Sequence, residues 1–421
     1  MTNPEKMKKI LASIALVLCC FAPVLAQEYN CFSIIAGKAA TVDGSVLMGH
    51  NEDDEGEQML NIYVVPASDR NLRYIWCEFP GMEVADSYMN QFGVSIASNV
   101  CPSREDKGEF TNGGVLYEVR SAVAKYARTA REAVEIIGSM VETLGYKGSG
   151  RSYIVADTAE GWVVSVVKGK HWVAQRVPDD QVMTIPNYYV IGEIDLNDDF
   201  NFAGCDDIVD YAVSRGWYDP KKDGAFNFAK AYAAESTLTS KNNITRHKEA
   251  WNYFFGTDKP GTFAAVPQKK VSLRDFANVL ALHEMPDAKG HLENSICNDN
   301  TVLSAIFQLR GSMGFDTGCV MWIAMGHPCS EVYVPWYAGM TQAPKGMGRY
   351  ATPQEAEKKH MSDSKNLRKN YPNHFYWKYV DGWDVSKDQS ELRREILRER
   401  RKFEKLPDKE KDYNAFVAKF Y

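Results

Sequence analysis

The chain has 421 residues, of which 45% are hydrophobic and 12% aromatic, so it is long and apolar enough to bury a large core. Its formal net charge is −6; the first thirty residues contribute three lysines and two glutamates, so the remainder carries about −7. An acidic chain of this kind is a poor candidate for nucleic-acid binding, and we expect no nucleic-acid partner.

The N-terminus has the pattern of a secretory signal peptide. Three lysines lie within the first nine residues, residues 10–25 are mostly apolar, and a small-residue cleavage pattern ends at Ala26. The apolar run is too short for a typical membrane span, and a lipoprotein anchor at Cys19 or Cys20 is disfavoured because no small residue precedes either cysteine. We therefore expect residues 1–26 to be removed and the protein to be periplasmic or secreted, with no stable membrane association.

Four residues, 27–30, separate the expected cleavage site from Cys31. If these residues are a short propeptide that is removed, Cys31 becomes the N-terminus and carries both a thiol and an α-amine. The reference pKa of such an amine is about 8, so its neutral form can accept the proton that the thiol must lose. The alternative is an ordinary buried cysteine at the start of a strand.

The residues that follow Cys31 predict a β-hairpin. Two apolar runs, 32–36 and 45–48, flank the dipeptide Asp43-Gly44, which is a strong turn signal. The return strand would carry residues 51–53 back toward Cys31, and a thiol and carboxylates would then meet at one end of the hairpin.

The rest of the chain predicts runs of strands and runs of helices, which favours an α+β fold over alternating βαβ units. A capping box formed by Thr129 and Glu132 marks the start of one helix. We expect strands at 61–65, 72–77, 93–99, 153–157, 162–167, 172–177, 319–325 and 331–336, and helices at 116–126, 130–144, 225–234 and 273–282. Residues 31–343 are expected to form one catalytic domain, and residues 344–421 a charged, partly helical C-terminal extension with a helix near 390–405.

Several motifs together resemble a known family. They are Cys31-Phe-Ser-Ile, the Asp43-Gly44 turn, Gly-His-Asn-Glu-Asp at 49–53, and the blocks at 171–180, 296–298 and 333–337. These motifs resemble the dipeptidases related to dipeptidase A and the secernins, in the N-terminal nucleophile (Ntn) hydrolase superfamily. The resemblance spans roughly residues 31–339. It implies a four-layer αββα sandwich and a cysteine dipeptidase that acts on dipeptide substrates and needs no metal or organic cofactor.

The resemblance also implies four catalytic residues. Cys31 would be the nucleophile and Asp53 the buried carboxylate that faces it, while Asn99 and Asn187 would donate hydrogen bonds to the oxyanion of the tetrahedral intermediate. Without the resemblance, Asp53 reads as a surface turn residue and the two asparagines as turn formers.

Three further residues are candidates for binding the substrate. Glu52 and His50 lie beside Asp53 in sequence, and Arg246 weakly matches a later active-site arginine. His50 occupies the position at which the related choloylglycine hydrolases and penicillin acylases have an arginine, which puts an arginine-like role there in doubt. From the sequence alone, a surface position is the more common one for an arginine such as Arg246.

The remaining cysteines leave the disulfide question open. Six of them beyond Cys31 follow the leader, enough for three disulfides, although buried thiols are at least as common in a domain of this size. No CxxC pair occurs, and His283 and His291 are too scattered for metal ligands, so no metal site is expected.

Two alternative functions remain open. One is an amidase for non-peptide amides, such as conjugated bile acids or penicillins, and the other is a non-catalytic binding protein on the same fold. The sequence also leaves a homo-oligomer open.

Overall fold

The computed structural model describes residues 31–54, 58–81, 87–261, 263–283, 294–359, 362, 365–377 and 389–421. The expected signal peptide and propeptide therefore lie outside the described residues. Within the described part, no helix has the length and apolar character needed to cross a membrane.

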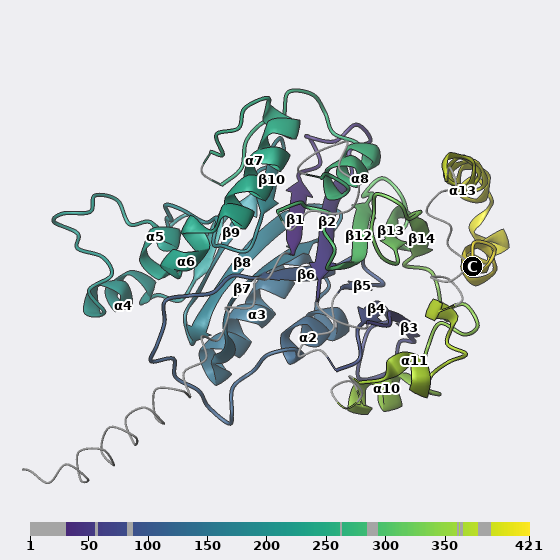
Figure 1. Cartoon of the computed structure of the whole chain (residues 1–421), viewed down its shortest axis with the longest axis horizontal. Coiled ribbons are helices and arrows are strands. Elements are labelled where there is room, and N and C mark those ends of the chain that lie inside the picture. The colour runs from purple at the N-terminus through teal and green to yellow at the C-terminus, as the bar shows by residue number, and fades with distance from the viewer. Residues whose placement is uncertain are drawn as a thin grey trace, which may run out of the picture.

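The described residues form two antiparallel sheets (Figure 1). The first has six strands in the order β10 (Val182–Ile185), β1 (Phe32–Ala36), β2 (Val46–Asp53), β12 (Thr301–Leu309), β13 (Cys319–Ala324) and β14 (Val334–Tyr337). The second has eight, in the order β11 (Phe202–Gly204), β9 (Trp172–Val177), β8 (Gly161–Gly169), β7 (Tyr146–Ala156), β6 (Ser95–Val100), β5 (Tyr88–Asn90), β4 (Tyr74–Glu78) and β3 (Asn61–Val65).

The hairpin predicted after Cys31 is present. β1 and β2 pair antiparallel, with Phe32 opposite Asn51 and Ser33 opposite His50. Gly44, at the turn, has a φ of 72°, a conformation that glycine adopts without strain. The carboxylates at the end of β2 are therefore carried back beside Cys31, as the sequence predicted.

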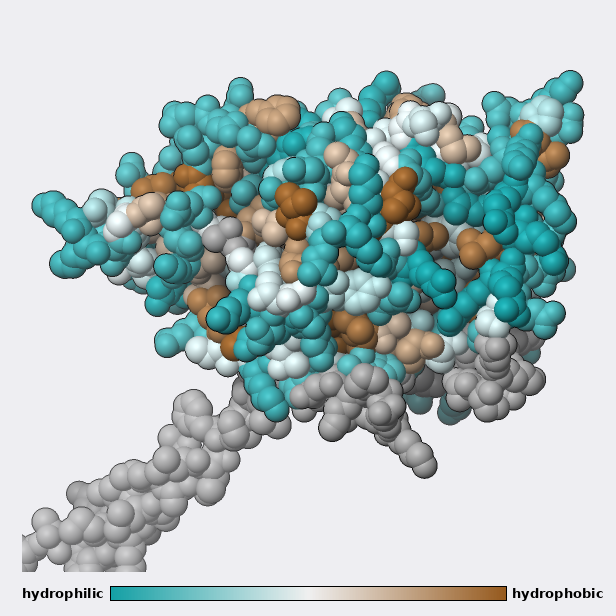
Figure 2. All heavy atoms as spheres, turned by 90° about the horizontal axis from the view of Figure 1, so that it is seen from above, coloured by the Kyte–Doolittle hydropathy of each residue, from teal (hydrophilic) through white to brown (hydrophobic). Residues whose placement is uncertain are grey.

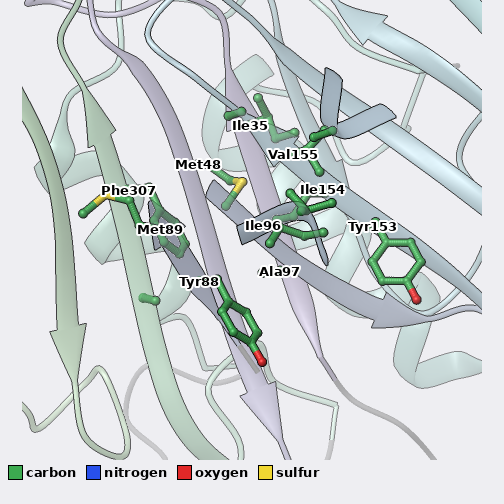
Figure 3. Packing of buried hydrophobic residues seen from close by; sticks show 14 of the residues in the cluster. Ile35, Met48, Tyr88, Met89, Ile96, Ala97, Tyr153, Ile154, Val155 and Phe307 are labelled. Carbon is green, nitrogen blue, oxygen red and sulfur yellow. The ribbon is translucent and has the colours of Figure 1, made fainter. Parts of the chain in front are cut away.

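Apolar side chains from both sheets meet in one core. Figure 3 shows Ile35 and Met48, from β1 and β2, in the same cluster as Met89, Ile96 and Val155 of the second sheet. All five side chains are completely buried. Removing such side chains from water is the main stabilising contribution to a domain of this kind.

Helices cover the outer faces of the sheets. α2 (Glu118–Tyr126) and α3 (Ala130–Leu144) contact the eight-stranded sheet, while α7 (Lys241–Phe255) contacts β10 and α8 (Leu273–Leu280) contacts β2 and β12 (Figure 1). α8 and β2 approach closely at Gly49, where an added Cβ would lie 2.9 Å from Cδ1 of Phe276. The chain is a mixed α/β protein built on two antiparallel sheets, in agreement with the predicted class.

The start of α3 differs slightly from the predicted capping box. The Thr129 side chain accepts a hydrogen bond from the Glu132 backbone N–H, as predicted. The Glu132 carboxylate, however, accepts from the backbone N–H of Arg128 and not from that of Thr129. The helix is therefore capped, but the reciprocal bond falls one residue earlier.

The remaining helices lie mostly between the strands and toward the C-terminus. They are α4 (Ile208–Ser214), α5 (Phe228–Tyr232), α6 (Glu235–Thr239), α9 (Phe315–Gly318), α10 (Pro353–Lys359), α11 (Leu367–Asn370), α13 (Ser390–Phe403), the 3₁₀ helix η1 (Asp408–Glu410) and α14 (Tyr413–Ala418).

The C-terminal helices share the main core. Phe403 of α13 and Phe416 of α14 stack with ring centroids 4.3 Å apart, and both pack against Tyr337 of β14. On α13, Ile396 and Phe403 are buried, whereas Leu397 is 43% exposed. Among the residues that the structure describes, the exposed large hydrophobic side chains are scattered along the chain. The face in Figure 2 is mostly hydrophilic, with hydrophobic residues in small separate groups.

Candidate active site

Cys31 lies immediately before β1 and is 2% exposed. Its backbone carbonyl accepts hydrogen bonds from Nδ2 of Asn99 and from Nη1 of Arg246, each at 3.0 Å. Asn99 belongs to the second sheet and Arg246 to α7, which contacts the first. Two elements distant in sequence, β6 and α7, therefore fix the main chain of Cys31.

Asn99 connects the two sheets beside Cys31. Its Nδ2 donates to the carbonyl of Cys31 and, at 3.1 Å, to the carbonyl of Ile185 at the end of β10. Its Oδ1 accepts from the hydroxyl of Ser33. Because these contacts occupy both amide hydrogens, Asn99 positions Cys31 and would donate to an oxyanion only by exchanging one of these bonds.

Asn187 follows β10 and is 3% exposed. Its Nδ2 donates to the Val100 carbonyl at 2.9 Å, and its Oδ1 accepts from Nη2 of Arg246 at 3.0 Å. Among the described residues, this arrangement leaves one Nδ2 hydrogen for a further acceptor.

Arg246 is completely buried on α7. Besides Cys31 and Asn187, it donates from Nη2 to Oδ1 of Asn243, one helical turn earlier, at 2.8 Å. The surface position that the sequence favoured for this arginine is therefore wrong. The sequence missed the helix because its buried face carries Asn243, Arg246 and His247, which hides the apolar period.

Two signals for α7 were nevertheless present. Ser240 caps its first turn by accepting from the backbone N–H of Asn243, and Gly256 ends it in the left-handed conformation. Together, a capping serine before the helix and a glycine after its fifteen residues predict α7.

Asp53, at the end of β2, is 7% exposed. Nδ2 of Asn298 donates to its Oδ2, and Thr301 lies opposite it in β12. Burial raises the pKa of the Asp53 carboxyl from 3.8 to about 7, although hydrogen bonds from Asn298 and Thr301 and the positive charge of Arg246 oppose the shift. Near neutral pH this carboxyl is therefore divided between its neutral and ionised forms.

The thiol of Cys31 is held in its neutral form. Burial raises its pKa well above the usual range, and the negative charges of Glu52 and Asp53 raise it further. A backbone hydrogen bond from Asp53 and the positive charge of Arg151 act in the opposite direction but do not reverse the shift. Attack by this sulfur requires a base that removes the proton as the thiolate forms.

His50 forms a buried chain with Ser33 and Glu52. Its Nδ1 is 2.9 Å from Oγ of Ser33, and its Nε2 is 3.1 Å from Oε2 of Glu52. Since Ser33 donates its only hydrogen to Asn99, its oxygen accepts from Nδ1–H of His50. The two contacts fix the orientation of the His50 ring between Ser33 and Glu52.

The structure thus brings all seven candidate residues into a single connected region around Cys31. The contacts that complete it come from residues to which the sequence gave no role: Ser33, Asn243, Asn298 and Thr301. The positive charge of Arg151 also acts on the Cys31 thiol. His171, the first residue of the 171–180 motif, lies outside this region. It stacks on Tyr211 with ring centroids 3.8 Å apart and lines a cavity of about 430 Å³ with Asp207.

Comparison with known proteins adds the family. The model of peptidase family C69 matches residues 109–366. The probable dipeptidase B of Streptococcus pyogenes serotype M1 is 26% identical over 388 residues, covering 80% of this chain and 77% of that protein. The probable dipeptidase of Salmonella dublin is 27% identical over 381 residues, covering 79% and 86%, respectively.

A solved structure, the Caenorhabditis elegans N-acylethanolamine-hydrolyzing acid amidase ortholog, is 14% identical, covering 65% of this chain and 91% of that one. Its TM-score of 0.34 is too low to assign a shared fold. The family match, by contrast, spans more than half of the chain. This protein therefore belongs to peptidase family C69 and is a peptidase.

Proposed function

We propose that the protein is a dipeptidase in which Cys31, after removal of residues 1–30, is an N-terminal nucleophile. The main support is the convergence of Asn99 and Arg246 on the carbonyl of Cys31, which holds this residue in one orientation immediately before β1. Support for dipeptides as substrates comes from the relatives, which are named dipeptidases or probable dipeptidases.

The α-amine of the processed Cys31 would serve as the base. Because burial and two carboxylates keep the thiol protonated, a thiolate does not form without a proton acceptor, and the amine is on the same residue. The amine takes the thiol proton as sulfur attacks the peptide carbonyl carbon. When the C–N bond breaks, the same proton passes to the leaving amine, and a thioester remains. Water then attacks the thioester, which releases the acid and restores the thiol.

Asn187 is the better of the two candidate oxyanion donors. Arg246 fixes its Oδ1, and one Nδ2 hydrogen lies outside the bond to Val100. Asn99 donates both amide hydrogens to backbone carbonyls, so we assign it chiefly to positioning Cys31.

Asp53 is the carboxylate that we assign to the ammonium group of the substrate. Glu52 is paired with His50, which leaves it less able to receive the ammonium. An ammonium bound at Asp53 would set the distance from the free N-terminus to the scissile bond, and the enzyme would then select dipeptides. His50 and Arg246 would support this ammonium site indirectly, through their hydrogen bonds to Glu52 and Cys31.

Several broader assignments accompany this function. We infer that the two sheets and the helices on their outer faces correspond to the four-layer αββα arrangement of Ntn hydrolases. We also infer a catalytic domain at 31–343, a C-terminal extension at 344–421, and a periplasmic or secreted location.

One experiment tests both the maturation and the nucleophile. The mass of the purified active protein should correspond to a chain beginning at Cys31, and Cys31→Ala should abolish dipeptide hydrolysis while residues 27–30 stay attached. A fully active enzyme that begins at Gln27 would overturn the α-amine mechanism. Removal of 27–30 in Cys31→Ala would show that another protease performs the processing.

A second experiment tests selection of the free N-terminus. Wild type should cleave a free dipeptide on the order of 30- to 1000-fold faster in kcat/KM than its N-acetylated form, because the acetylated substrate lacks the ammonium. Asp53→Asn should lose most of this preference, whereas Asp180→Asn, at an exposed position, should keep it. Equal cleavage of both substrates by wild type would favour the amidase alternative.

A further inference from the structure

Three metal-ligand side chains converge at a place that the proposed reaction does not use. A ring nitrogen of His283 and the sulfurs of Cys297 and Cys329 all lie within 4.8 Å of one another. They come from three separate segments: His283 follows α8, Cys297 precedes β12, and Cys329 lies between β13 and β14. These residues are far apart in the sequence, so they form no CxxC-type motif.

The main chain holds these ligands in position. The backbone N–H of Cys297 donates to the Leu282 carbonyl at 3.0 Å, which keeps Cys297 beside the residue preceding His283. Cys329 lies in a turn closed by hydrogen bonds from the backbone N–H groups of Ser330 and Glu331 to the His327 carbonyl. Prepositioned ligands lower the entropic cost of binding a cation.

The donor set selects a particular class of cation. Two sulfurs and an imidazole suit Zn²⁺ and related thiophilic cations, and they are poor ligands for Mg²⁺ or Ca²⁺. At Zn–S distances of about 2.3 Å, tetrahedral ligand atoms lie roughly 3.5–4 Å apart, which the 4.8 Å limit accommodates.

Zn²⁺ binds cysteine in its thiolate form. Binding of one Zn²⁺ ion by Cys297 and Cys329 would therefore release both thiol protons to solvent.

We propose that His283, Cys297 and Cys329 bind one Zn²⁺ ion, which ties together the segments after α8, before β12 and between β13 and β14. Three protein ligands leave the fourth tetrahedral position of the ion to water, and the proposed reaction does not use the site. It also adjoins the active site, because Asn298 follows Cys297 and donates to Asp53. A disulfide between the two cysteines is the competing use of the same thiols, whereas a metal ion would also use the imidazole nitrogen that lies within 4.8 Å of both sulfurs.

The test uses the full chain carrying Cys31→Ala, which removes the nucleophilic thiol as a competing ligand and makes the readout independent of activity. After incubation with Zn²⁺ and dialysis, elemental analysis should find about one zinc ion per chain, and Co²⁺ in its place should give a sulfur-to-cobalt charge-transfer band. Added Cys329→Ser or His283→Gln should lose at least about tenfold in zinc affinity. Added Cys205→Ser, at a buried cysteine next to Trp172, should retain the ion.

Three outcomes would overturn the proposal. The first is a protein that retains no zinc although both thiols react with a thiol reagent. The second is a pair of thiols that becomes reactive only after reduction, which identifies a disulfide. The third is zinc retained equally by Cys329→Ser and His283→Gln. If both variants fail to fold, the Tm of the Cys31→Ala protein decides: Zn²⁺ should raise it relative to excess chelator, and an unchanged Tm counts against the site.

Discussion

At the scale of single residues, the site around Cys31 is defined by buried polar groups that satisfy one another. Asn99, Asn187 and Arg246 exchange hydrogen bonds with the main chain of Cys31 and with neighbouring strands. Beside them, Asp53 is a carboxyl group held near the midpoint of its titration at neutral pH. The Asp53 carboxyl should make stability depend on pH, and loss of a hydrogen bond in the polar network should lower both stability and activity.

The first prediction concerns the effect of Asp53 on stability. Its pKa is about 7 in the folded protein and near 3.8 when unfolded, so between these values the folded state holds a proton that the unfolded state has lost. The free energy of unfolding therefore falls as pH rises from about 4 to 7, by on the order of 4 kcal/mol for this group alone.

Asp53→Asn removes this dependence. Urea denaturation between pH 4.5 and pH 8 should show the variant gaining stability relative to wild type as pH rises. If the difference between the denaturation midpoints of wild type and Asp53→Asn stays constant from pH 4.5 to pH 8, burial does not raise the pKa of Asp53.

The second prediction concerns Arg246. Arg246→Met leaves the side-chain oxygen of Asn187 without its arginine donor. It also removes one of two hydrogen bonds to the carbonyl of Cys31 and one of two to Oδ1 of Asn243. We expect a loss of about 2–4 kcal/mol in unfolding free energy and a fall in kcat/KM of at least about 100-fold, measured by denaturation and steady-state kinetics. Arg274→Met, at an exposed position on α8, is the matched control. Full activity in Arg246→Met would exclude the arginine from the site.

At the scale of elements, the β1–β2 hairpin determines where the chemistry is located. Its register places Ser33 opposite His50 and brings the end of β2 back to Cys31, while α8 packs on the outer side of β2. Because consecutive side chains of a strand point to opposite faces, a one-residue slip would turn His50 and Glu52 away from their partners.

The third prediction tests this packing at Gly49. Gly49→Ala places a methyl group 2.9 Å from Phe276 and 3.2 Å from Leu280, so α8 must shift away from β2. We expect a destabilisation of about 1–3 kcal/mol in chemical denaturation. Gly314→Ala, where nothing lies within 4 Å of the added carbon and φ is −60°, should change stability little. Equal effects of the two substitutions would contradict the close contact.

At the scale of the whole molecule, the C-terminal helices are joined to the six-stranded sheet by a charged cluster as well as by aromatic packing. Glu404 accepts hydrogen bonds from Arg310 at 2.8 Å and from Arg400 at 2.7 Å, and Arg400 also donates to Gln308 on β12. Burial would raise the pKa of Glu404, but the two arginines lower it overall. The cluster connects α13 to β12.

The fourth prediction is that Glu404→Gln weakens this connection. Two arginines that are each 10% exposed would lose their counter-charge, at an expected cost of about 2–4 kcal/mol in unfolding free energy. Glu410→Gln, at an exposed position in η1, should have little effect. If the two variants unfold at the same denaturant concentration, the cluster does not stabilise the C-terminal helices.

The sequence by itself determined the local elements. The Asp43-Gly44 turn, the periodicity of residues 130–144 and the meander from 153 to 177 each depend on near neighbours, and the structure has all three. The motifs around Cys31 and their resemblance to a dipeptidase family were also readable, and the family match agrees with them.

Only the tertiary structure decided how the distant residues meet. Arg246 looked like a surface residue because its helix buries polar side chains, and such a face follows no apolar period. Likewise, His283, Cys297 and Cys329 looked scattered because they come from three segments that approach one another only when the strands pair. Local sequence pattern reports near-neighbour preferences, whereas contacts between distant residues depend on the packing of the whole chain.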